Sequence, residues 1–285
     1  MEIFLMDGIL NINKPKGITS HDVVYKVRKS LGIKKVGHTG TLDPNATGVL
    51  PIVIGRATKI ADYIMNGDKM YIAEIILGKK TTTGDITGEI LEEAEANISE
   101  ERFKQVTENF IGEIPQIPPM FSAIKKGGIP LYKLARKNVE VEREARIIHI
   151  NNIVIHKFCG KKAIVEVHCS KGTYIRTLCE DIGEKLGTFA CMGELQRTKS
   201  AGFSIENSVE LNDDLQKHII PTDFFFRNVS TLTLGEKYIK FLENGNKFYF
   251  KNNLAENEVR IYHNNKFYGI YKKEGDFLKP KIYLG

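Results

Sequence analysis

A single carboxylate, Asp43, lies in a loop of glycine, threonine and proline residues that runs from Gly37 to Pro51. Glycine lets the backbone adopt positive φ and approach a ligand closely, and Pro44 stiffens the turn after the acid. The apolar run from residue 49 to residue 54 predicts a buried strand that anchors the loop. Asp before Pro also begins many ordinary turns, so turn chemistry alone leaves a purely structural Asp43 open. The whole pattern favours a carboxylate held rigidly in a cleft.

A carboxylate that acts as a nucleophile or a general base must be ionised and shielded, which requires a nearby cation. Arg176 is the candidate for that cation. The sequence predicts that Arg176 lies at the end of a β-segment, on a turn loosened by Lys171 and Gly172. Most arginines are surface cations, so only the match with Asp43 singles this one out. We therefore expect Arg176 to point into the cleft that holds Asp43.

Several other chemistries lack their motifs in this chain. The sequence contains neither G-x-x-x-x-G-K-[ST] nor G-x-G-x-x-G, which argues against a nucleotide triphosphatase and a dinucleotide enzyme. No second acid occupies an equivalent loop, which argues against a two-carboxylate glycosidase. The seven histidines form no H-x-x-x-H pair, and Cys159, Cys169, Cys179 and Cys191 form no C-x-x-C pair. The sequence therefore predicts no metal site and four reduced thiols.

Periodicity and breaker residues predict a mixed order of helices and strands. We expect one helix capped by Ser20 and ending at Gly32, a second capped by Ser99, and a third that follows Arg176 and ends at Gly187. Runs rich in β-formers predict strands at Lys69–Leu77, Ile153–Phe158, Ala163–Cys169, Val259–His263 and Lys266–Lys273. Asn264 and Asn265 predict a hairpin turn between the last two.

Positive charge is concentrated in three segments of a chain whose formal net charge is +6. Residues 1–40 carry seven Lys and Arg residues against three acids, residues 124–146 carry seven against three, and residues 229–285 carry ten against six. Basic segments interleaved with Tyr and Phe suit a polyanion with exposed bases, because cations meet phosphates and rings stack on bases. Solvated lysines on helix faces would give the same counts, so both interpretations stay open.

Two segments differ in composition from the rest of the chain. Residues 115–146 contain four prolines and the pair Gly127 and Gly128 among alternating charges, which predicts a projecting arm. Residues 229–285 predict a small, mostly β unit. No apolar run reaches the about 18 residues of a membrane span, and Glu2 and Asp7 stand where a secretion signal carries positive charge. The sequence thus predicts a cytoplasmic protein that does not span a membrane.

Four motifs, in order along the chain, resemble those of the bacterial tRNA pseudouridine-55 synthases, the TruB family. They are LNINKPKGITS from residue 10, GHTGTLDPNATGVLPI from residue 37, KMY from residue 69 and SKGTYIRTL from residue 170. The resemblance implies a mixed α/β (α+β) pseudouridine-synthase fold with a central, largely antiparallel sheet, in a catalytic domain over residues 1–228. Residues 229–285 more weakly resemble a β-rich, RNA-binding PUA domain.

The resemblance also implies a reaction. It breaks the N1–C1′ bond of a uridine, turns the base and rejoins it through C5, and it consumes no cofactor. By this resemblance Asp43 is the catalytic carboxylate that attacks the nucleotide, and Arg176 pairs with it and keeps it ionised. Tyr71 stacks on the extruded uracil and can relay a proton. Extruding a base from its stack costs roughly a few kcal/mol.

Four further pocket residues follow from the resemblance. His38 is expected to occupy the space that the base vacates in the RNA loop. Tyr174 and Leu195 are expected to line the uracil pocket, and Lys14 is expected to lie nearby. From the residues alone, Tyr71 and Leu195 would be taken for core packing and His38 for a loop hydrogen-bonder.

Residues 115–146 match the family's thumb-like insertion, which closes over the T-arm of tRNA. We expect Lys125, Lys126 and Lys133 to contact the RNA backbone, so that the shape of a stem-loop is recognised more than its base edges. The chain departs from the family's T-D-T pattern, because residues 81–83 are all threonine ahead of Asp85. Asp85 is therefore expected to support its loop only.

Two alternatives stay open. A guide-RNA-dependent synthase of the archaeal and eukaryotic kind shares the Asp43 loop. The exact amino-acid sequence of the loop and the thumb-like insertion favour an enzyme that acts alone, as a monomer, on uridine 55 of tRNA. A tRNA-folding chaperone would use the same basic segments and C-terminal unit. An Asp43→Asn protein separates a synthase, which loses all product, from a chaperone, which keeps promoting folding.

Overall fold

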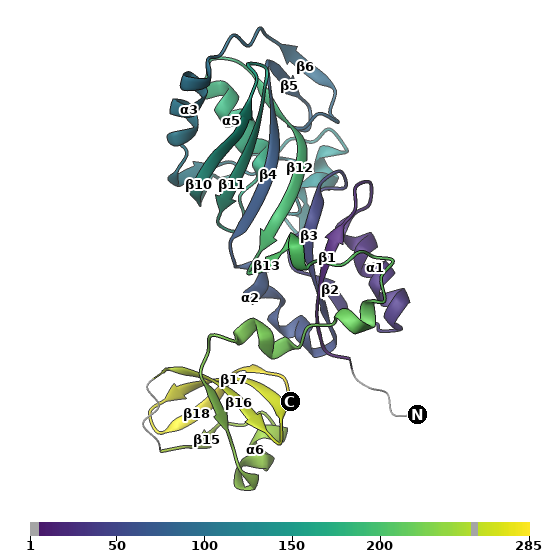
Figure 1. Cartoon of the computed structure of the whole chain (residues 1–285), viewed down its shortest axis with the longest axis vertical. Coiled ribbons are helices and arrows are strands. Elements are labelled where there is room, and N and C mark those ends of the chain that lie inside the picture. The colour runs from purple at the N-terminus through teal and green to yellow at the C-terminus, as the bar shows by residue number, and fades with distance from the viewer. Residues whose placement is uncertain (1–5, 252–255) are drawn as a thin grey trace.

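The chain forms a large unit built on one sheet, followed by a small β-rich unit (Figure 1). The computed structural model describes residues 6–251 and 256–285. The first unit occupies the upper part of Figure 1 and the C-terminal unit lies below it. No helix within the described residues is long and apolar enough to cross a membrane.

Nine strands form the central sheet, and seven of them lie in one path across it. Their order is β1 (Gly8–Lys14), β3 (Thr47–Ile54), β12 (Ala190–Ser200), β4 (Lys69–Leu77), β11 (Lys162–Cys169), β10 (Arg146–Phe158) and β7 (Gly112–Gln116). β2 (Val36–His38) pairs with β3, and β13 (Phe203–Ser204) pairs with β12. All neighbours are antiparallel except β3 and β12. The predicted mixed α/β fold with a largely antiparallel sheet is confirmed.

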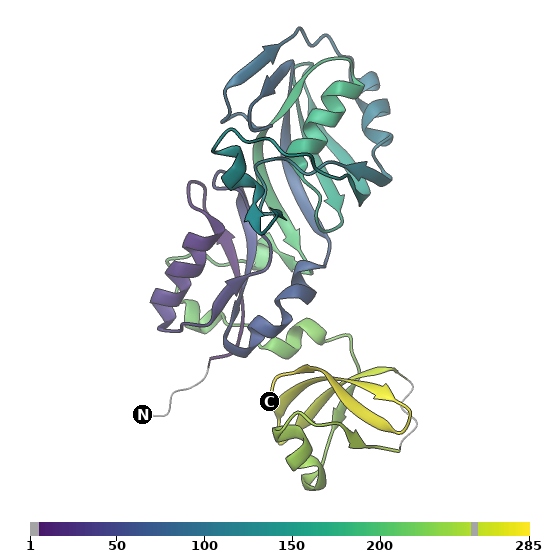
Figure 2. The same cartoon turned by 180° about the vertical axis from the view of Figure 1, so that it is seen from behind.

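Helices pack on both faces of this sheet (Figures 1 and 2). The α-helices are α1 (Ser20–Leu31), α2 (Ala61–Met65), α3 (Glu100–Glu108), α4 (Leu131–Ala135), α5 (Ile175–Lys185) and α6 (Ile239–Glu243). Short 3₁₀ helices are η1 (Gly55–Ile60), η2 (Ile205–Asn207), η3 (Leu215–His218), η4 (Thr222–Phe226) and η5 (Glu236–Tyr238). The main hydrophobic core lies between the sheet and α1, α3 and α5, with Val24, Phe103 and Ile182 among its fully buried side chains.

The start of α1 differs from the prediction by one residue. Its N-cap is Thr19, whose hydroxyl accepts a hydrogen bond from the Asp22 N–H at 3.1 Å, while the Thr19 N–H donates to the Asp22 carboxylate at 2.8 Å. Ser20 is instead the first helical residue and is buried. The predicted cap at Ser20 is therefore wrong, because a capping box forms one residue earlier. The predicted end at Gly32 is confirmed, with φ of 66°.

The strand predicted at residues 153–158 is only the second half of β10. The first half of β10 pairs with β7. Residues 117–145 connect these two neighbouring strands and lie outside the sheet. We call residues 117–145 the thumb segment. It contains a hairpin of β8 (Lys125–Lys126) and β9 (Ile129–Pro130), followed by α4. In Figure 2 the thumb segment, in dark teal, passes in front of the sheet toward the end that carries β1 and β3.

A second small hairpin joins β4 to α3. It consists of β5 (Lys79–Thr81) and β6 (Ile90–Glu93), whose connecting loop holds Asp85. Two hydrogen bonds join this loop to Met192 of β12. The Ile86 N–H donates to the Met192 carbonyl, and the Met192 N–H donates to the Gly84 carbonyl. This loop is therefore fixed to the central sheet.

The C-terminal unit is a five-stranded sheet with α6 beside it. Its strands, in order, are β14 (Thr231–Thr233), β16 (Glu258–His263), β17 (Lys266–Glu274), β18 (Phe277–Tyr283) and β15 (Phe248–Tyr249). Asn264 and Asn265 both adopt positive φ, 48° and 60°, between β16 and β17. The predicted hairpin turn is confirmed, because Asn tolerates this conformation better than most residues.

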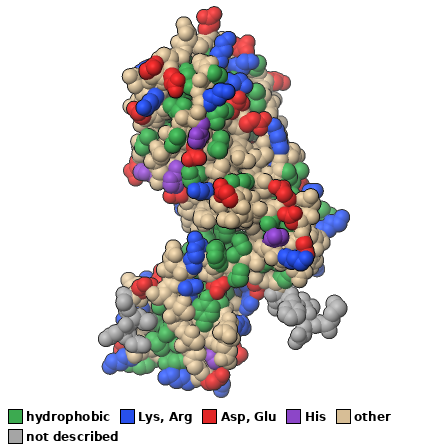
Figure 3. All heavy atoms as spheres, viewed as in Figure 1, with side chains coloured by type: hydrophobic (Ala, Val, Ile, Leu, Met, Phe, Trp, Pro, Cys, Tyr) green, Lys and Arg blue, Asp and Glu red, His purple; other side chains and the backbone are tan. Residues whose placement is uncertain are grey.

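The two units share a hydrophobic cluster. Ile270, Ile282 and Leu284 of the C-terminal unit belong to the same cluster as Val53 and Ile60 of the first unit. Figure 3 shows hydrophobic side chains at the surface where the units meet. Arg56, the second residue after the end of β3, binds Asp7 at 2.6 Å and donates to the Leu284 carbonyl at 2.5 Å. One end of β3 is thus attached to the C-terminal unit.

Candidate active site

The Asp43 loop connects β2 to β3 and is held by Ser20. The Ser20 hydroxyl accepts a hydrogen bond from the Leu42 N–H at 2.8 Å and donates to the Leu42 carbonyl at 3.0 Å. The Leu42 and Ala46 side chains are buried on either side of Asp43, and the Ala46 N–H donates to the Asp43 carbonyl at 3.1 Å. The loop is therefore rigid at the position that carries the acid.

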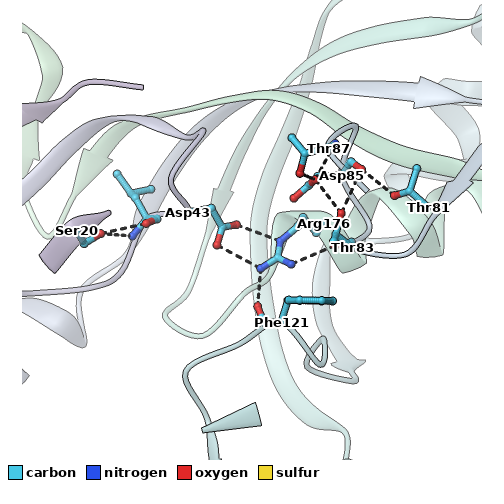
Figure 4. A network of polar contacts seen from close by, with 9 residues as sticks. Ser20, Asp43, Thr81, Thr83, Asp85, Thr87, Phe121 and Arg176 are labelled. Carbon is cyan, nitrogen blue, oxygen red and sulfur yellow. Dashed lines mark hydrogen bonds and ion pairs between the residues drawn. The ribbon is translucent and has the colours of Figure 1, made fainter. Parts of the chain in front are cut away.

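Asp43 and Arg176 form a two-point ion pair (Figure 4). Arg176 Nε lies 3.0 Å from Asp43 Oδ2, and Arg176 Nη2 donates to Asp43 Oδ1 at 3.3 Å. The Arg176 side chain is 6% exposed and that of Asp43 is 37% exposed. The pair predicted from the sequence lies together in the structure, with the carboxylate open to an incoming molecule. A fork of this kind fixes both the position and the orientation of a carboxylate.

Arg176 lies within the first turn of α5 and not on a turn before it, so that part of the prediction is wrong. Its remaining N–H groups donate to two backbone carbonyls, Thr83 at 3.1 Å and Phe121 at 2.8 Å. Thr83 belongs to the loop after β5, and Phe121 belongs to the thumb segment. Arg176 therefore joins three separate parts of the chain at Asp43.

The loop that presents Thr83 is organised by Asp85 (Figure 4). The Asp85 carboxylate accepts hydrogen bonds from the Thr83 hydroxyl at 2.9 Å and from the Thr87 N–H at 3.0 Å. The Thr81 hydroxyl donates to the Asp85 carbonyl at 2.8 Å. Asp85 makes no ion pair with Arg176 within the described residues. These contacts agree with the supporting role expected of Asp85.

The charges around Asp43 act on its ionisation in opposite directions. Burial raises the pKa of Asp43 above its ordinary value, and Arg176 opposes this as the second largest influence. Asp85 adds to the rise, and Lys14 adds to the opposition. The expected role of Arg176 in favouring the ionised form agrees in direction, but burial has the larger effect on the pKa. Shifted pKa values occur more often at functional sites than elsewhere in proteins.

Tyr71 lies on β4 beside the Asp43 loop and belongs to the main hydrophobic core, 8% exposed. Burial raises the pKa of its phenol, the Arg197 guanidinium opposes that shift, and Asp43 adds to it. Leu195 lies on β12, in register with Ala73 of β4, and is also 8% exposed. Both residues are thus core side chains at the border of the site.

His38 lies just before the Asp43 loop, and Tyr174 lies just before the helix that carries Arg176. His38 ends β2, and its Nδ1 accepts a hydrogen bond from the Gly40 N–H at 3.4 Å. Burial lowers the pKa of His38, and the positive charges of His21 and Arg197 lower it further. Tyr174 immediately precedes α5 and is held through its backbone by the Gln116 side chain, at 2.8 and 3.1 Å.

Lys14 is fully buried, and its ammonium binds the protein itself. Its Nζ donates to the carbonyls of Pro15 at 2.9 Å, Ile18 at 2.7 Å and Pro44 at 3.0 Å. Burial lowers the pKa of Lys14 to about 8, which Asp43 partly opposes. Lys14 therefore lies next to Asp43, as expected, and holds the residue that follows it.

Replacing Lys14 by Met is expected to lower the free energy of unfolding by about 2–4 kcal/mol, because three carbonyls lose their buried donor. Urea unfolding at equilibrium measures this difference. Lys16→Met is the matched control, since the Lys16 side chain is 54% exposed and pairs with the exposed Glu194; its expected effect is below about 1 kcal/mol. Equal losses in the two variants would contradict the anchoring role.

Comparison with known proteins identifies the family of the chain. Residues 28–175 match the model of the TruB family pseudouridylate synthase N-terminal domain, and residues 176–223 match that of the tRNA pseudouridylate synthase B C-terminal domain. A tRNA pseudouridine synthase B of Alkaliphilus oremlandii is 47% identical to this chain, and the alignment covers 94% of each of the two proteins. The chain belongs to the TruB family of pseudouridine synthases. Proteins of the same name from Clostridium tetani and Neisseria meningitidis, 48% and 41% identical, cover 96% and 94% of this TruB-family chain.

Solved structures support the TruB-family fold. A chain of a Cbf5–Nop10–Gar1 complex superposes with a TM-score of 0.72 at 24% identity. The match covers 98% of this chain and 85% of the chain in the complex. A chain of an H/ACA RNP bound to a substrate RNA that contains 2′-deoxyuridine matches with a TM-score of 0.70 at 22% identity. The predicted pseudouridine-synthase fold is confirmed by these likenesses.

The remaining features of the TruB-family site concern metals and the thumb segment. Within residues 6–251 and 256–285, no group of three or more His, Cys, Asp or Glu side chains could hold a metal ion. Lys125, Lys126 and Lys133 are exposed on the thumb segment, and Lys126 donates to the Glu142 carbonyl at 2.5 Å. These lysines belong to the segment whose Phe121 carbonyl binds Arg176.

Sequence reasoning missed several groups that shape the site. The Thr83 and Phe121 carbonyls are backbone atoms, and no side-chain pattern indicates where a carbonyl will point. Ser20 was noticed only as a helix cap. Arg197 was not noticed at all, although it is the largest side chain that is fully buried among the described residues.

Proposed function

We propose that this enzyme isomerises uridine 55, in the T-loop of tRNA, to pseudouridine, and that it does so without a guide RNA. Membership of the TruB family supports pseudouridine synthesis, and the name shared by the relatives supports tRNA as the substrate. The observation that carries the proposal is the fork between Arg176 and Asp43, which holds one accessible carboxylate among buried groups.

In the proposed reaction, Asp43 attacks the target nucleotide and the bond between N1 and C1′ breaks. The uracil then turns and C5 bonds to C1′ as the Asp43 carboxylate is released, while the C5 hydrogen leaves as a proton and N1 gains one, so that the product is an isomer. Arg176 orients the carboxylate and favours its ionised form. Tyr71 stacks on the extruded uracil, and its phenol can relay a proton.

The other site residues have proposed roles that depend on base extrusion. The target uridine must leave its stack to reach Asp43. His38, partly exposed at the start of the loop, fills the space left in the RNA. Tyr174 and Leu195 line the uracil pocket. Lys14 keeps Pro44, and so Asp43, in place beneath the substrate.

We further propose that the thumb segment and a PUA-like domain over residues 229–285 bind the RNA outside the pocket, with residues 1–228 as the catalytic domain. The enzyme is proposed to act as a monomer in the cytoplasm. The T-arm is then recognised by its folded shape and its phosphates.

Replacing Lys125, Lys126 and Lys133 together by Ala is expected to flatten the salt dependence of tRNA binding. Loss of three phosphate contacts reduces the slope of log K against log salt by about 2–3. Filter binding over a series of salt concentrations measures the slope. Alanine at Lys104, Lys157 and Lys161, all exposed near the far end of β11, is the matched control. The same slope in wild type and thumb variant would contradict phosphate binding by the thumb segment.

The experiment that tests the function is tritium release from a tRNA transcript labelled with [5-³H]uridine. Purified protein alone is expected to release tritium stoichiometrically with tRNA, because forming the C5–C1′ bond expels that hydrogen. A transcript with cytidine at position 55 is expected to release none. Release from both transcripts would contradict the position, and binding without release would contradict the guide-independent activity.

A further inference from the structure

Arg197 is a buried cation whose hydrogen bonds go to uncharged groups. It lies on β12, is 1% exposed, and takes part in no ion pair within the described residues. Its guanidinium donates to the Val49 carbonyl at 2.7 Å and to the Gly40 carbonyl at 3.1 Å. Burying a charge without a counter-charge is costly, so a position that retains one calls for a physical reason.

The two carbonyls that Arg197 binds lie at the two ends of the Asp43 loop. Gly40 is the second residue of the loop after β2, and Val49 is the third residue of β3, which follows the loop. The backbone of Arg197 pairs with Gly48, whose φ is 100°. A Cβ at Gly48 would lie 2.2 Å from the Arg197 carbonyl oxygen, so only glycine allows β3 to approach β12 this closely. One guanidinium therefore closes the base of the loop.

Arg197 also lies against Tyr71. The two residues are direct cross-strand partners in β12 and β4, which places their side chains next to each other on the same face. Burial raises the pKa of the Tyr71 phenol and the neighbouring guanidinium opposes that shift. Arg197 thus contacts both the strand that carries the stacking residue and the loop that carries the carboxylate.

We propose that Arg197 is a positioning residue of the isomerisation, which sets the distance between Asp43 and Tyr71 by binding both ends of the Asp43 loop from β12. This inference rests on the proposed function. Lys14 and Arg176 each hold the loop near its middle, through Pro44 and through the Asp43 side chain. Arg197 holds its ends. A planar fork spans two carbonyls at fixed separation, whereas an ammonium acts as a single point.

Arg197→Lys and Arg197→Met are both expected to slow single-turnover tritium release about 100-fold, since a displacement of about 1 Å has an effect of that size. Affinity for tRNA is expected to stay unchanged, because Arg197 is too buried to touch RNA. It is measured in an Asp43→Asn background, where no conversion occurs. Hydrogen exchange is expected to rise in peptides that cover residues 39–50 and to stay constant in the C-terminal unit.

Lys69→Met is the matched control for loss of a buried cation. Lys69 is 6% exposed, and its ammonium donates to the Met65 and Gly67 carbonyls, outside the loop. All rates are measured well below each variant's melting temperature. Full activity in Arg197→Lys, or an equal rate loss in Lys69→Met, would overturn the proposal. Absence of release by the wild-type enzyme would instead overturn the proposed function, so the two failures are distinguishable.

Discussion

Asp43→Asn protein is expected to form no pseudouridine while still binding tRNA. Asparagine keeps the shape of the side chain, but it is not charged and is a poor nucleophile. Removing a group of this kind lowers rates by about 10⁴-fold or more. Single-turnover tritium release measures the rate, and filter binding measures the affinity. The fork from Arg176 can still donate to the asparagine oxygen, so the fold is expected to persist.

Two comparisons make this prediction specific. Asp62→Asn, at an exposed position of α2, removes the same charge and is expected to leave the rate unchanged. A tRNA-folding assay with Asp43→Asn separates modification from chaperone activity, because a chaperone needs no nucleophile. Product formation by Asp43→Asn at a rate within tenfold of wild type would remove Asp43 from the chemistry.

Arg176→Gln is expected to show the second largest effect, a loss of about 10²–10³-fold in the single-turnover rate. Glutamine cannot supply the fork, the charge, and the donors for the Thr83 and Phe121 carbonyls together. Arg176→Lys restores the charge but not the fork, so it is expected to recover only part of the rate. Full recovery by lysine would show that charge alone is required.

The same variant has a predictable effect on the pH profile. Burial raises the pKa of Asp43 and Arg176 lowers it, so removing Arg176 leaves a carboxyl that protonates at higher pH. Because the ionised form is the active one, the acid limb of the rate profile is expected to move to higher pH in Arg176→Gln. Single-turnover rates measured from pH 5 to pH 9 locate the limb. A lower rate with an unmoved limb would mean that Arg176 acts only on geometry.

Much of the fold follows from local sequence signals. The turn at Asn264 and Asn265, the end of α1 at Gly32, and the strand β4 each depend on residues close in sequence. The order of the strands in the central sheet does not follow from local signals. β12 inserts between β3 and β4, which are consecutive neighbours in the sequence, and no local pattern in residues 190–200 indicates this.

The same distinction explains the site. Asp43 was singled out by its own loop, and Arg176 by the charge that Asp43 requires together with the family resemblance. Arg197 had no such signal, because its partners are backbone carbonyls brought to it by the parallel pairing of β3 with β12. Lys14 was expected near the substrate, but its buried ammonium binds three carbonyls, a role that depends on how the chain after β1 curls around it.

β3 connects the Asp43 loop to the C-terminal unit. Its first residues follow the Asp43 loop, and its last residue precedes the Gly55–Arg56 corner that binds Leu284 of the C-terminal unit. Eight residues of paired strand, about 26 Å long, resist compression and extension. The paired strand therefore keeps the distance between the Asp43 loop and the C-terminal unit constant.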